Sequence, residues 1–513
     1  MRYFIFIVAV LFFAGCTKLG PDFKKPDPIE YPKNIPQQSN VTQEELATWW
    51  EMFHDKTLEK LVKTGYKNNL DIKQAGLRIL QARAALGVTQ GYYYPQQQTL
   101  SAHAMSSYAK NHNINSAGIN FDIGWEIDFW GKYARGVEGA EAALYLNVAS
   151  YRGIMSSVVA EIARVYINYK TTQERIVYAK RNIAIGERVA KMTEVQFNSG
   201  NVSELDMQQA RTQLYTTKAK LPSLKLSLQK SINALALLLA VPNTEIEKML
   251  EQDSPVQNSS DYLEMKTSVI ALSEKNKDAL ELKVIPTASF LPEKKISIEL
   301  LQKRPDVQVA EYKARVQSAK IGSTKALLYP SFVLFGSVGI NANDALGDWT
   351  SFSDGLGVGA GPALSWNIFQ YGRIKNRVRI EDARFQEALY GYNKTLLQAL
   401  NELSNAINAY MYTQEQLKEN KKALHATVRA FNLSARQYND GLVSYQRLLS
   451  TVEKLTMTQD LYAQIKGSVA VDAVLIYKAL GGGWQGSDSQ DYLDEQTKKQ
   501  LKSRGVDWGE YLE

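Results

Sequence analysis

Two stretches of the chain alternate apolar with polar or small residues, with a period of two over more than ten positions. In the first, the odd positions from Ile119 to Phe129 are all apolar, and the even positions hold Asn, Asp, Gly or Glu. In the second, from Leu356 to Ile368, apolar residues alternate with glycine and other small or polar residues. This period predicts β-strands with one apolar face. The strands are about twice the usual 5–6 residues of a soluble sheet, a length typical of strands that cross a membrane.

Each of these strands follows a less regular strand-like stretch, so we expect two hairpins, at about 96–130 and 332–370. Four strands cannot close a membrane barrel, because the smallest have about eight, and open strand edges cannot face lipid. The chain must therefore share a barrel with copies of itself. A dimer with eight strands and a trimer with twelve are both open from the residues alone. Trp125, Trp130 and Trp366 are expected at the lipid–water boundary, where tryptophan is enriched.

Helices of unusual length are predicted next to the hairpins. The run from Lys132 to Phe197 contains no proline, and roughly 66 residues of helix extend for about 100 Å. Its apolar residues recur at spacings of three and four, as in a coiled-coil seam. A returning helix is expected over Ser203–Ala240, with a kink at Pro222. A short helix over Asp71–Tyr94 would stack end to end with Ser203–Ala240 beside the long helix, giving a two-layer helical wall.

The chain contains two copies of one unit. Asp71-Ile72 and Tyr94-Pro95 recur 235 positions later, as Asp306-Val307 and Tyr329-Pro330. From the second strand of each hairpin the offset is 241, and the matching pairs are Trp125 and Trp366, Gly131 and Gly372, Gly200 and Gly441, and Leu239 and Leu480. All of the change in length falls between Pro95 and Trp125, which predicts surface loops there. The long helical hairpin therefore recurs at about 373–438 and 444–480.

Composition excludes several classes of protein. Among 513 residues, 60 Lys and Arg face 53 Asp and Glu, a net charge of +7, with no basic run of the kind that nucleic-acid binding needs. Four His and one Cys exclude zinc ribbons, iron–sulfur clusters and disulfide frameworks. A mean hydropathy of −0.29 and the lack of an apolar run of about 20 residues exclude a polytopic helical membrane protein.

The sequence offers no catalytic or metal site. The histidines His54, His103, His112 and His425 lie far apart without ligand spacing, and there is no Gly-x-Ser-x-Gly or Walker A motif. The acidic residues are interpreted as charges on solvent-exposed helix faces. We therefore expect neither an enzyme nor a cofactor, and any energy must come from a partner. A purely structural coiled-coil lipoprotein is the other alternative, but it would have no use for the alternating strands.

The single cysteine ends an export signal. Arg2 precedes an apolar run from Tyr3 to Phe13, and Phe13-Ala14-Gly15-Cys16 resembles the lipobox of bacterial lipoproteins, with Phe where Leu is usual. Residues 1–15 are therefore expected to be removed as a signal peptide. Cys16 would then carry a diacylglycerol and an N-acyl chain, which together anchor a protein stably. An ordinary secretory signal with an incidental cysteine is the alternative.

These features together resemble the TolC-like outer-membrane efflux proteins, in particular the acylated branch that serves resistance–nodulation–division pumps. The resemblance rests on Cys16, the Gly20-Pro21-Asp22 and Arg304-Pro305-Asp306 runs, the Tyr-Pro pairs that follow the short helices, and the two glycine turns. It implies a mixed α and β trimer. Four strands per chain would form a twelve-stranded outer-membrane β-barrel, which continues into a twelve-helix periplasmic α-barrel with a small equatorial domain.

The resemblance also implies a function. Such a hollow trimer would be the passive exit duct of a tripartite multidrug efflux pump, lipid-anchored in the outer membrane. Its partners would be a periplasmic adaptor and an inner-membrane resistance–nodulation–division transporter. The outer-membrane channel of a type I protein secretion system has the same fold and is the alternative.

The repeat and the resemblance together divide the chain. The expected parts are a signal peptide (1–15), an N-terminal acylated and equatorial segment (16–70), repeat 1 (71–241), an inter-repeat equatorial segment (242–303), repeat 2 (304–482) and a C-terminal tail (483–513) that is equatorial or in part disordered.

The helical turns at about 198–203 and 439–444 are expected to form the periplasmic tip. Gly200 and Gly441 fit the left-handed position after a helix, and Ser203 and Ser444 fit the N-cap of the returning helix. Asp206 would complete a capping box with Ser203. The resemblance implies that adaptor hairpins dock on these turns, and the docking candidates are Gly200, Val202, Ser203, Gly441, Val443 and Ser444.

The gate is expected one helical turn further in. The candidates are Asp206, Gln446, Arg447 and Ser450. The resemblance implies that polar contacts between inner helices hold the tip closed, and Asp206 matches a position that takes part. Relatives commonly carry acidic residues where this chain has Arg447 and Ser450. An ion pair between Asp206 and Arg447 of a neighbouring helix is therefore our hypothesis.

Overall fold

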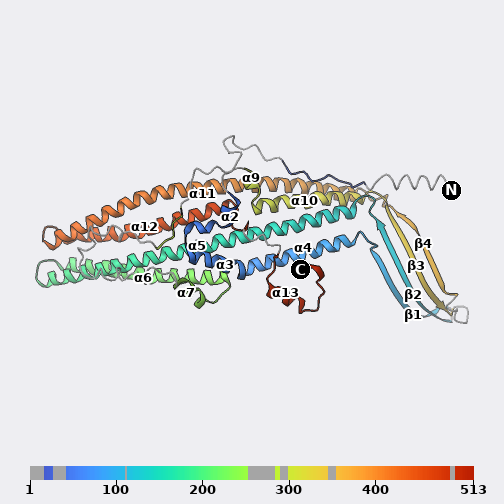
Figure 1. The fold of residues 1–513 in the computed structure, drawn as a ribbon, viewed down its shortest axis with the longest axis horizontal. Helices are drawn as coiled ribbons and strands as arrows, with labels where there is room; N and C mark the ends of the chain where they lie inside the picture. Colours follow the sequence, from blue (N-terminus) through green and yellow to red (C-terminus); the bar gives the residue numbers. More distant parts are fainter. Residues whose placement is uncertain are drawn as a thin grey trace.

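The computed structural model describes residues 17–26, 42–109, 112–251, 284–288, 298–344, 354–485 and 491–512. The predicted lipid attachment at Cys16 lies outside these residues. The described chain is elongated, with a four-stranded sheet at one end and two helical hairpins whose turns lie at the other end (Figure 1).

The sheet is antiparallel, in the order β1 (Gln97–Ala109), β2 (His112–Ile127), β3 (Ser331–Asn343) and β4 (Leu356–Ser365). β2 begins seven residues before the predicted strand. β4 ends at Ser365, three residues before the alternation ends at Ile368. Residues 366–370 belong to no strand and lead to a turn at Tyr371 and Gly372, which both have a positive φ. Among the described residues, no other strand pairs with the outer edge of β1 or of β4. The sheet therefore ends in two open edges.

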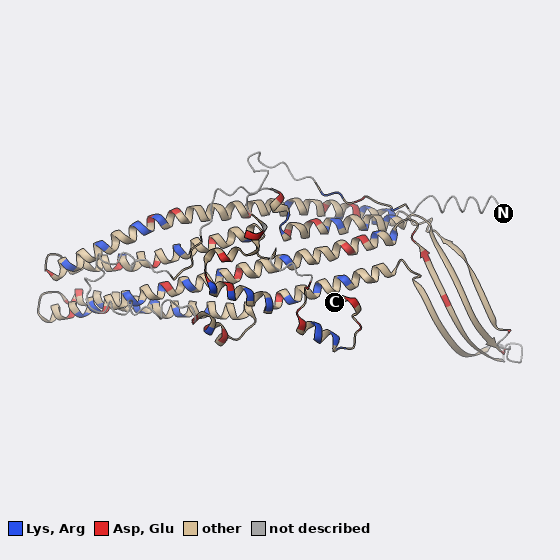
Figure 2. Ribbon diagram, in the orientation of Figure 1, with Lys and Arg blue, Asp and Glu red and all other residues tan. Residues whose placement is uncertain are grey.

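The strand register places apolar residues together on one face. Val338 lies opposite Phe121 on β2 and Val358 on β4, and Phe121 lies opposite Leu100 on β1. The other face carries small or polar residues along all four strands, such as Ser101, Asn120, Asp122, Ser337 and Gly359. The strands hold two charged residues, Asp122 and Glu126, and Figure 2 shows how this differs from the charge-rich helices. Large apolar side chains such as Leu100 and Val358 are 73% and 75% exposed, so this face needs an apolar surrounding.

The helices have the predicted lengths and repeat. α5 (Lys132–Asn198) and α11 (Arg373–Asn439) have 67 residues each, and α6 (Glu204–Leu239) and α12 (Tyr445–Ala479) return beside them. α6 continues through Pro222. The short helices α4 (Leu70–Gly91) and α10 (Pro305–Ala326) lie next to α5 on the sheet side. α4 ends three residues before the predicted end, because Tyr92–Tyr94 turn back to bond the carbonyls of residues 89–91.

The short and returning helices join end to end, as expected for a two-layer wall. In repeat 1, the side-chain amide of Asn69 donates to the Leu238 carbonyl at 2.8 Å. In repeat 2, the Arg304 guanidinium donates to the Ala479 carbonyl at 2.6 Å. Asn69 and Arg304 are equivalent positions at the offset of 235, and Leu238 and Ala479 are equivalent at 241. Each bond satisfies a carbonyl that the end of a helix would leave without a partner.

Small elements surround the middle of the helices (Figure 1). They are α2 (Gln43–Ala47), the 3₁₀ helix η1 (Trp49–Phe53), α3 (Lys56–Asn68), α7 (Asn243–Glu251), α9 (Ile298–Gln302), α13 (Glu495–Lys502) and the 3₁₀ helix η5 (Gly509–Leu512). Trp49 and Phe53 are buried in the main core, where Trp49 stacks on Tyr477. Leu501 and Leu512 of the tail pack against Leu80 of α4. Except for α3 and α9, which correspond in part at the offset of 235, these elements come from segments without a repeat counterpart.

No single helix among the described residues is both long and apolar enough to cross a membrane. α6 and α7 together have the length and composition of a membrane span, but the two helices are bent by 110° relative to each other.

Candidate functional site

The turn of each helical hairpin has the geometry that its glycine predicts. Gly200 has a φ of 74° and Gly441 a φ of 71°, values that favour glycine. The Asn201 N–H bonds the Gln196 carbonyl at 2.9 Å, and the Leu442 N–H bonds the Gln437 carbonyl at 2.8 Å. These six-to-one bonds form a Schellman motif at the end of both α5 and α11. The role of the turns in docking stays a prediction.

The returning helices begin differently in the two repeats. In repeat 1, the Ser203 hydroxyl accepts from the Asp206 N–H at 3.2 Å, and the Asp206 carboxylate accepts from the Ser203 N–H at 3.1 Å. This is the predicted capping box. In repeat 2, Ser444 is the N-cap residue but its side chain caps nothing. Arg447 stands where Asp206 stands in repeat 1, so no carboxylate accepts from the Ser444 N–H.

The gate candidates do not meet within one chain. Gln446, Arg447 and Ser450 are exposed and Asp206 is half-buried. Within the described part of the chain, neither Asp206 nor Arg447 forms an ion pair. The proposed pair therefore requires a second copy of the chain, and it stays a hypothesis.

An apolar cluster with two tyrosines supports the tip. Tyr438 and Tyr445 pack edge to face, with ring centroids 6.0 Å apart. Burial raises the pKa of both tyrosines, and the nearby Asp206 carboxylate adds to the rise. The Tyr438 hydroxyl donates to Gln196 of α5 and so ties the two hairpins together. Val443 is half-buried against this cluster, so part of its surface is used by the tip itself.

Two exposed leucines at the tips were not predicted from the sequence. Leu205 is 66% exposed and Leu442 is 73% exposed, more than Val202 and Val443, which are both half-buried. The signal was present in the sequence, because Leu442 directly follows the turn glycine Gly441. Both leucines join the candidates for adaptor docking.

Glu174 and Lys466 form a buried ion pair that the sequence did not predict. The interpretation of all acidic residues as exposed helix-face charges is wrong for Glu174, which is fully buried and pairs with Lys466 of α12 at 3.1 Å. Burial raises the pKa of Glu174, although Lys466 and the backbone N–H groups of Ile285 and Val284 oppose the rise. The pair thus holds the inter-repeat segment against the contact between α5 and α12.

The predicted boundary tryptophans fasten the sheet to the helices. The Trp125 indole N–H donates to the Tyr93 carbonyl at 3.1 Å, and its repeat equivalent Trp366 donates to the Leu328 carbonyl at 3.0 Å. Trp130 is half-buried and donates to the Pro330 carbonyl at 2.7 Å. Trp125 and Trp366 remain 37% and 51% exposed at the end of the sheet. Their contact with a lipid surface stays a prediction.

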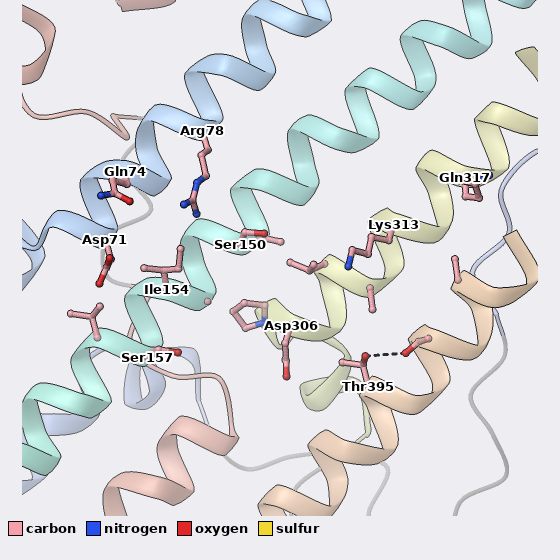
Figure 3. Close-up of a pocket in the computed structure, with 18 of the residues that line it drawn as sticks. Asp71, Gln74, Arg78, Ser150, Ile154, Ser157, Asp306, Lys313, Gln317 and Thr395 are labelled. Carbon is pink, nitrogen blue, oxygen red and sulfur yellow. Dashed lines mark hydrogen bonds between the residues drawn. The ribbon is translucent and has the colours of Figure 1, made fainter. Parts of the chain in front are cut away.

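A cavity of about 1140 Å³ lies between α4, α5, α10 and α11 (Figure 3). Its lining is mixed, with apolar residues such as Ile154 and Val309 beside six charged ones. The charged residues are Asp71, Arg78, Asp306, Lys313, Arg384 and Glu387. The described residues contain no group of His, Cys, Asp or Glu that could hold a metal ion.

The sequence profile of a family described as "Outer membrane efflux protein" matches the chain twice, over residues 61–241 and 297–482. These two matches cover more than half of the chain and correspond to the two repeats. The chain is 24% identical over 500 residues to "Probable outer membrane lipoprotein SilC" of Salmonella typhimurium, covering 93% of this chain and 98% of SilC. It is also 24% identical over 485 residues to "Cation efflux system protein CusC" of Escherichia coli O157:H7, covering 92% and 96%.

The fold is similar to the crystal structure of the Campylobacter jejuni CmeC outer membrane channel. The TM-score is 0.76 at 22% identity, over 96% of this chain and 99% of CmeC. The sequence suggests a particular likeness to this channel of the Cme pump, but at 22% identity the match shows the fold alone and singles out no one member. The predicted fold of four antiparallel strands and long helices in a duplicated chain is confirmed.

Proposed function

Since the chain belongs to the outer membrane efflux protein family, we propose that three copies form the exit duct of a tripartite multidrug efflux pump. The family is one of outer-membrane efflux channels, not enzymes. The observation that carries the proposal is a sheet with two open edges and one apolar face, joined directly to helices of 67 residues. Such helices extend for about 100 Å.

Three chains close the barrel in this proposal. The free edge of β1 in one copy pairs with the free edge of β4 in the next, so that no edge faces lipid. The apolar face that contains Phe121 and Val338 then faces lipid, and the face that contains Asp122 and Ser337 lines the lumen. The four long helices of each chain continue the wall into the periplasm.

A lipid anchor at Cys16 fits the position of the residues that follow it. The Leu19 N–H bonds the Trp130 carbonyl at 3.2 Å, next to the end of the sheet. Arg135, only 1% exposed, donates to the Leu19 and Gly20 carbonyls and pairs with Asp22 at 2.9 Å. Gly20, with a φ of 87°, lies so close to Gly322 that a Cβ would fall 2.5 Å from the Gly322 Cα. The segment after Cys16 is therefore fixed near the expected membrane surface, and SilC is itself named a lipoprotein.

A periplasmic adaptor and an inner-membrane transporter of the resistance–nodulation–division class would deliver the substrates. CusC is named for cation efflux. The cargo proposed here is drugs and other toxic compounds, as the resemblance to the multidrug branch implies. A type I protein secretion channel is the second candidate, and it rests on the shared fold alone.

Deletion of the gene followed by complementation tests the proposed cargo. We expect the deletion strain to accumulate ethidium and to recover export when the full chain is restored. Ethidium export that is unchanged, with lost copper tolerance or lost secretion of a protein, would contradict the multidrug proposal.

The Asp206–Arg447 hypothesis makes a prediction about gating. Asp206→Arg or Arg447→Asp alone should raise the open fraction of the channel in planar bilayers, and the double reversal should restore closure. An exposed pair is worth at most about 1 kcal/mol, so three pairs per trimer change the open population by at most roughly a hundredfold. Because Asp206 also caps α6, Ser203→Ala is the control that removes the cap without removing the charge. A double reversal that leaks like the single variants would rule the pair out.

A further inference from the structure

Charged residues that the duplication relates lie around the cavity between α4, α5, α10 and α11. Asp71 of α4 corresponds to Asp306 of α10, and Arg78 corresponds to Lys313, both at the offset of 235. All four residues line the cavity. Figure 3 shows Arg78 and Lys313 reaching into it from α4 and α10, which pack on the two sides of α5. The two halves of the chain therefore place like charges at like positions along the wall.

Among the described residues, the two cations form no ion pair, whereas two other charges at the cavity do. Arg78 and Lys313 are exposed and form no ion pair with any residue that the structure describes. Asp306 is held by Arg304 at 2.7 Å, and Arg384 pairs with Glu381 at 2.8 Å.

The remaining carboxylates do not neutralise the two cations. Asp71 lies seven residues from Arg78 along α4, which is about 10 Å of helix, and salt screens most of an exposed interaction at that distance. Glu387 lines the same cavity from α11 without reaching Lys313 within ion-pair distance. It has no acidic counterpart in repeat 1, where Leu146 occupies the equivalent position.

We propose that Arg78 and Lys313 form a basic belt around the lumen, which favours amphiphilic organic anions among the solutes that pass. The belt rests on the proposed function, because it exists only if three copies surround one lumen. At this level of the wall each copy would supply the two cations and the carboxylate of Glu387, so the trimer would place six cations against three carboxylates there. The three Asp71 carboxylates would lie about 10 Å further along the wall. Rings of charged side chains set the ion preference of a pore in this way.

The cavity lining indicates an amphiphilic solute rather than a small inorganic ion. Apolar side chains of α5 and α10, among them Ile154 and Val309, line the cavity together with Ser150 and Ser157. A carboxylate or sulfonate would contact Arg78 or Lys313, and an apolar body would lie on these side chains. The volume of about 1140 Å³ exceeds the roughly 300–1,000 Å³ of a typical ligand pocket. The belt therefore guides passing solutes and does not hold them tightly.

Block of the channel current by a charged amphiphile tests the belt. The purified trimer is placed in planar bilayers, and octanesulfonate and octyltrimethylammonium are added at equal concentrations. We expect octanesulfonate to reduce the current more. The double variant Arg78→Gln, Lys313→Gln should weaken that block about five- to tenfold, and it should lower the chloride-to-potassium permeability ratio. Each single variant should weaken the block about two- to threefold.

Two variants serve as controls. The exchange Arg78→Lys with Lys313→Arg keeps both charges and should keep the block. Arg315→Gln removes an exposed charge two residues beyond Lys313, about 200° around α10, at a position that does not line the cavity. It should leave the block unchanged.

Each outcome decides for or against the belt. The belt is overturned if octanesulfonate blocks the wild type and the Gln variants of Arg78 and Lys313 equally. It is also overturned if Arg315→Gln weakens the block as much as those variants do. A wild-type trimer that conducts but ignores octanesulfonate overturns it as well and leaves the exit duct intact. A wild type that forms no trimer and no conductance contradicts the proposed function itself. If the double variant fails to insert, the two single variants decide.

Discussion

Val338→Arg is expected to prevent insertion of the channel into the outer membrane. Val338 lies near the middle of β3, on the apolar face of the sheet, opposite Phe121 and Val358. An arginine on the lipid face of a barrel near the midplane costs about 2–4 kcal/mol, and each trimer would carry three. The expected result is loss of the heat-resistant trimer from the outer-membrane fraction, measured by fractionation and gel electrophoresis without boiling.

The neighbouring residue provides a matched control. Ser337 lies one position away on the opposite face of β3, opposite Asp122. Ser337→Arg adds the same side chain at the same depth, but toward the lumen and next to an acidic residue. It should insert normally and change only the ion preference of the pore. Equal loss of trimer in both variants would mean that the two faces of the sheet are assigned wrongly or that the sheet lies outside the membrane.

Arg304→Met is expected to destabilise the wall where the helices of repeat 2 join. Arg304 is 6% exposed, donates to the Ala479 carbonyl of α12, and pairs with Asp306 and with Glu402 of α11. Methionine fills similar space but donates nothing, so a helix-terminal carbonyl loses its partner. Both carboxylates are about half exposed and can turn to water, which limits the loss to about 2–4 kcal/mol. Thermal unfolding of the detergent-solubilised protein measures it.

The equivalent junction in repeat 1 provides a comparison for the loss of stability in Arg304→Met. Asn69 is 3% exposed, donates to the Leu238 carbonyl and also caps α4. Asn69→Ala should cost about 1–2 kcal/mol, less than Arg304→Met, because no charged contacts are lost. Arg304→Lys should fall between the wild type and Arg304→Met. If Asn69→Ala is the more harmful change, Arg304 does not hold the junction in the manner described.

The parts of the fold that depend on short-range patterns were predictable from the sequence. The alternation from Ile119 onward gave the strands, and the glycines at 200 and 441 gave the turns, since few other residues adopt a positive φ. The constant offset between the halves predicted two copies of one unit, each with a β-hairpin and a long helical hairpin. Element ends were less accurate, because the Tyr92–Tyr94 turn and the early start of β2 depend on local hydrogen bonds.

Features that depend on tertiary contacts were not predictable. Glu174 has an ordinary place in a helical sequence, and its burial comes from Lys466 and from the backbone of residues 284 and 285, which are distant in the chain. Arg78 and Lys313 are visible as a pair once the repeat is aligned, but only the packing of α4 and α10 around α5 places both at one cavity. Two open edges do not fix the number of copies, because either eight or twelve strands would close them.

Native mass spectrometry of the detergent-extracted protein tests the central claim most directly. The expected result is a complex of three chains, each lacking residues 1–15 and carrying the mass of a diacylglycerol and an N-acyl chain on Cys16. Three chains close the barrel, and the added mass identifies the anchor. A monomer that is soluble without detergent and carries no lipid would contradict the account, because a sheet with two open edges cannot cross a membrane alone.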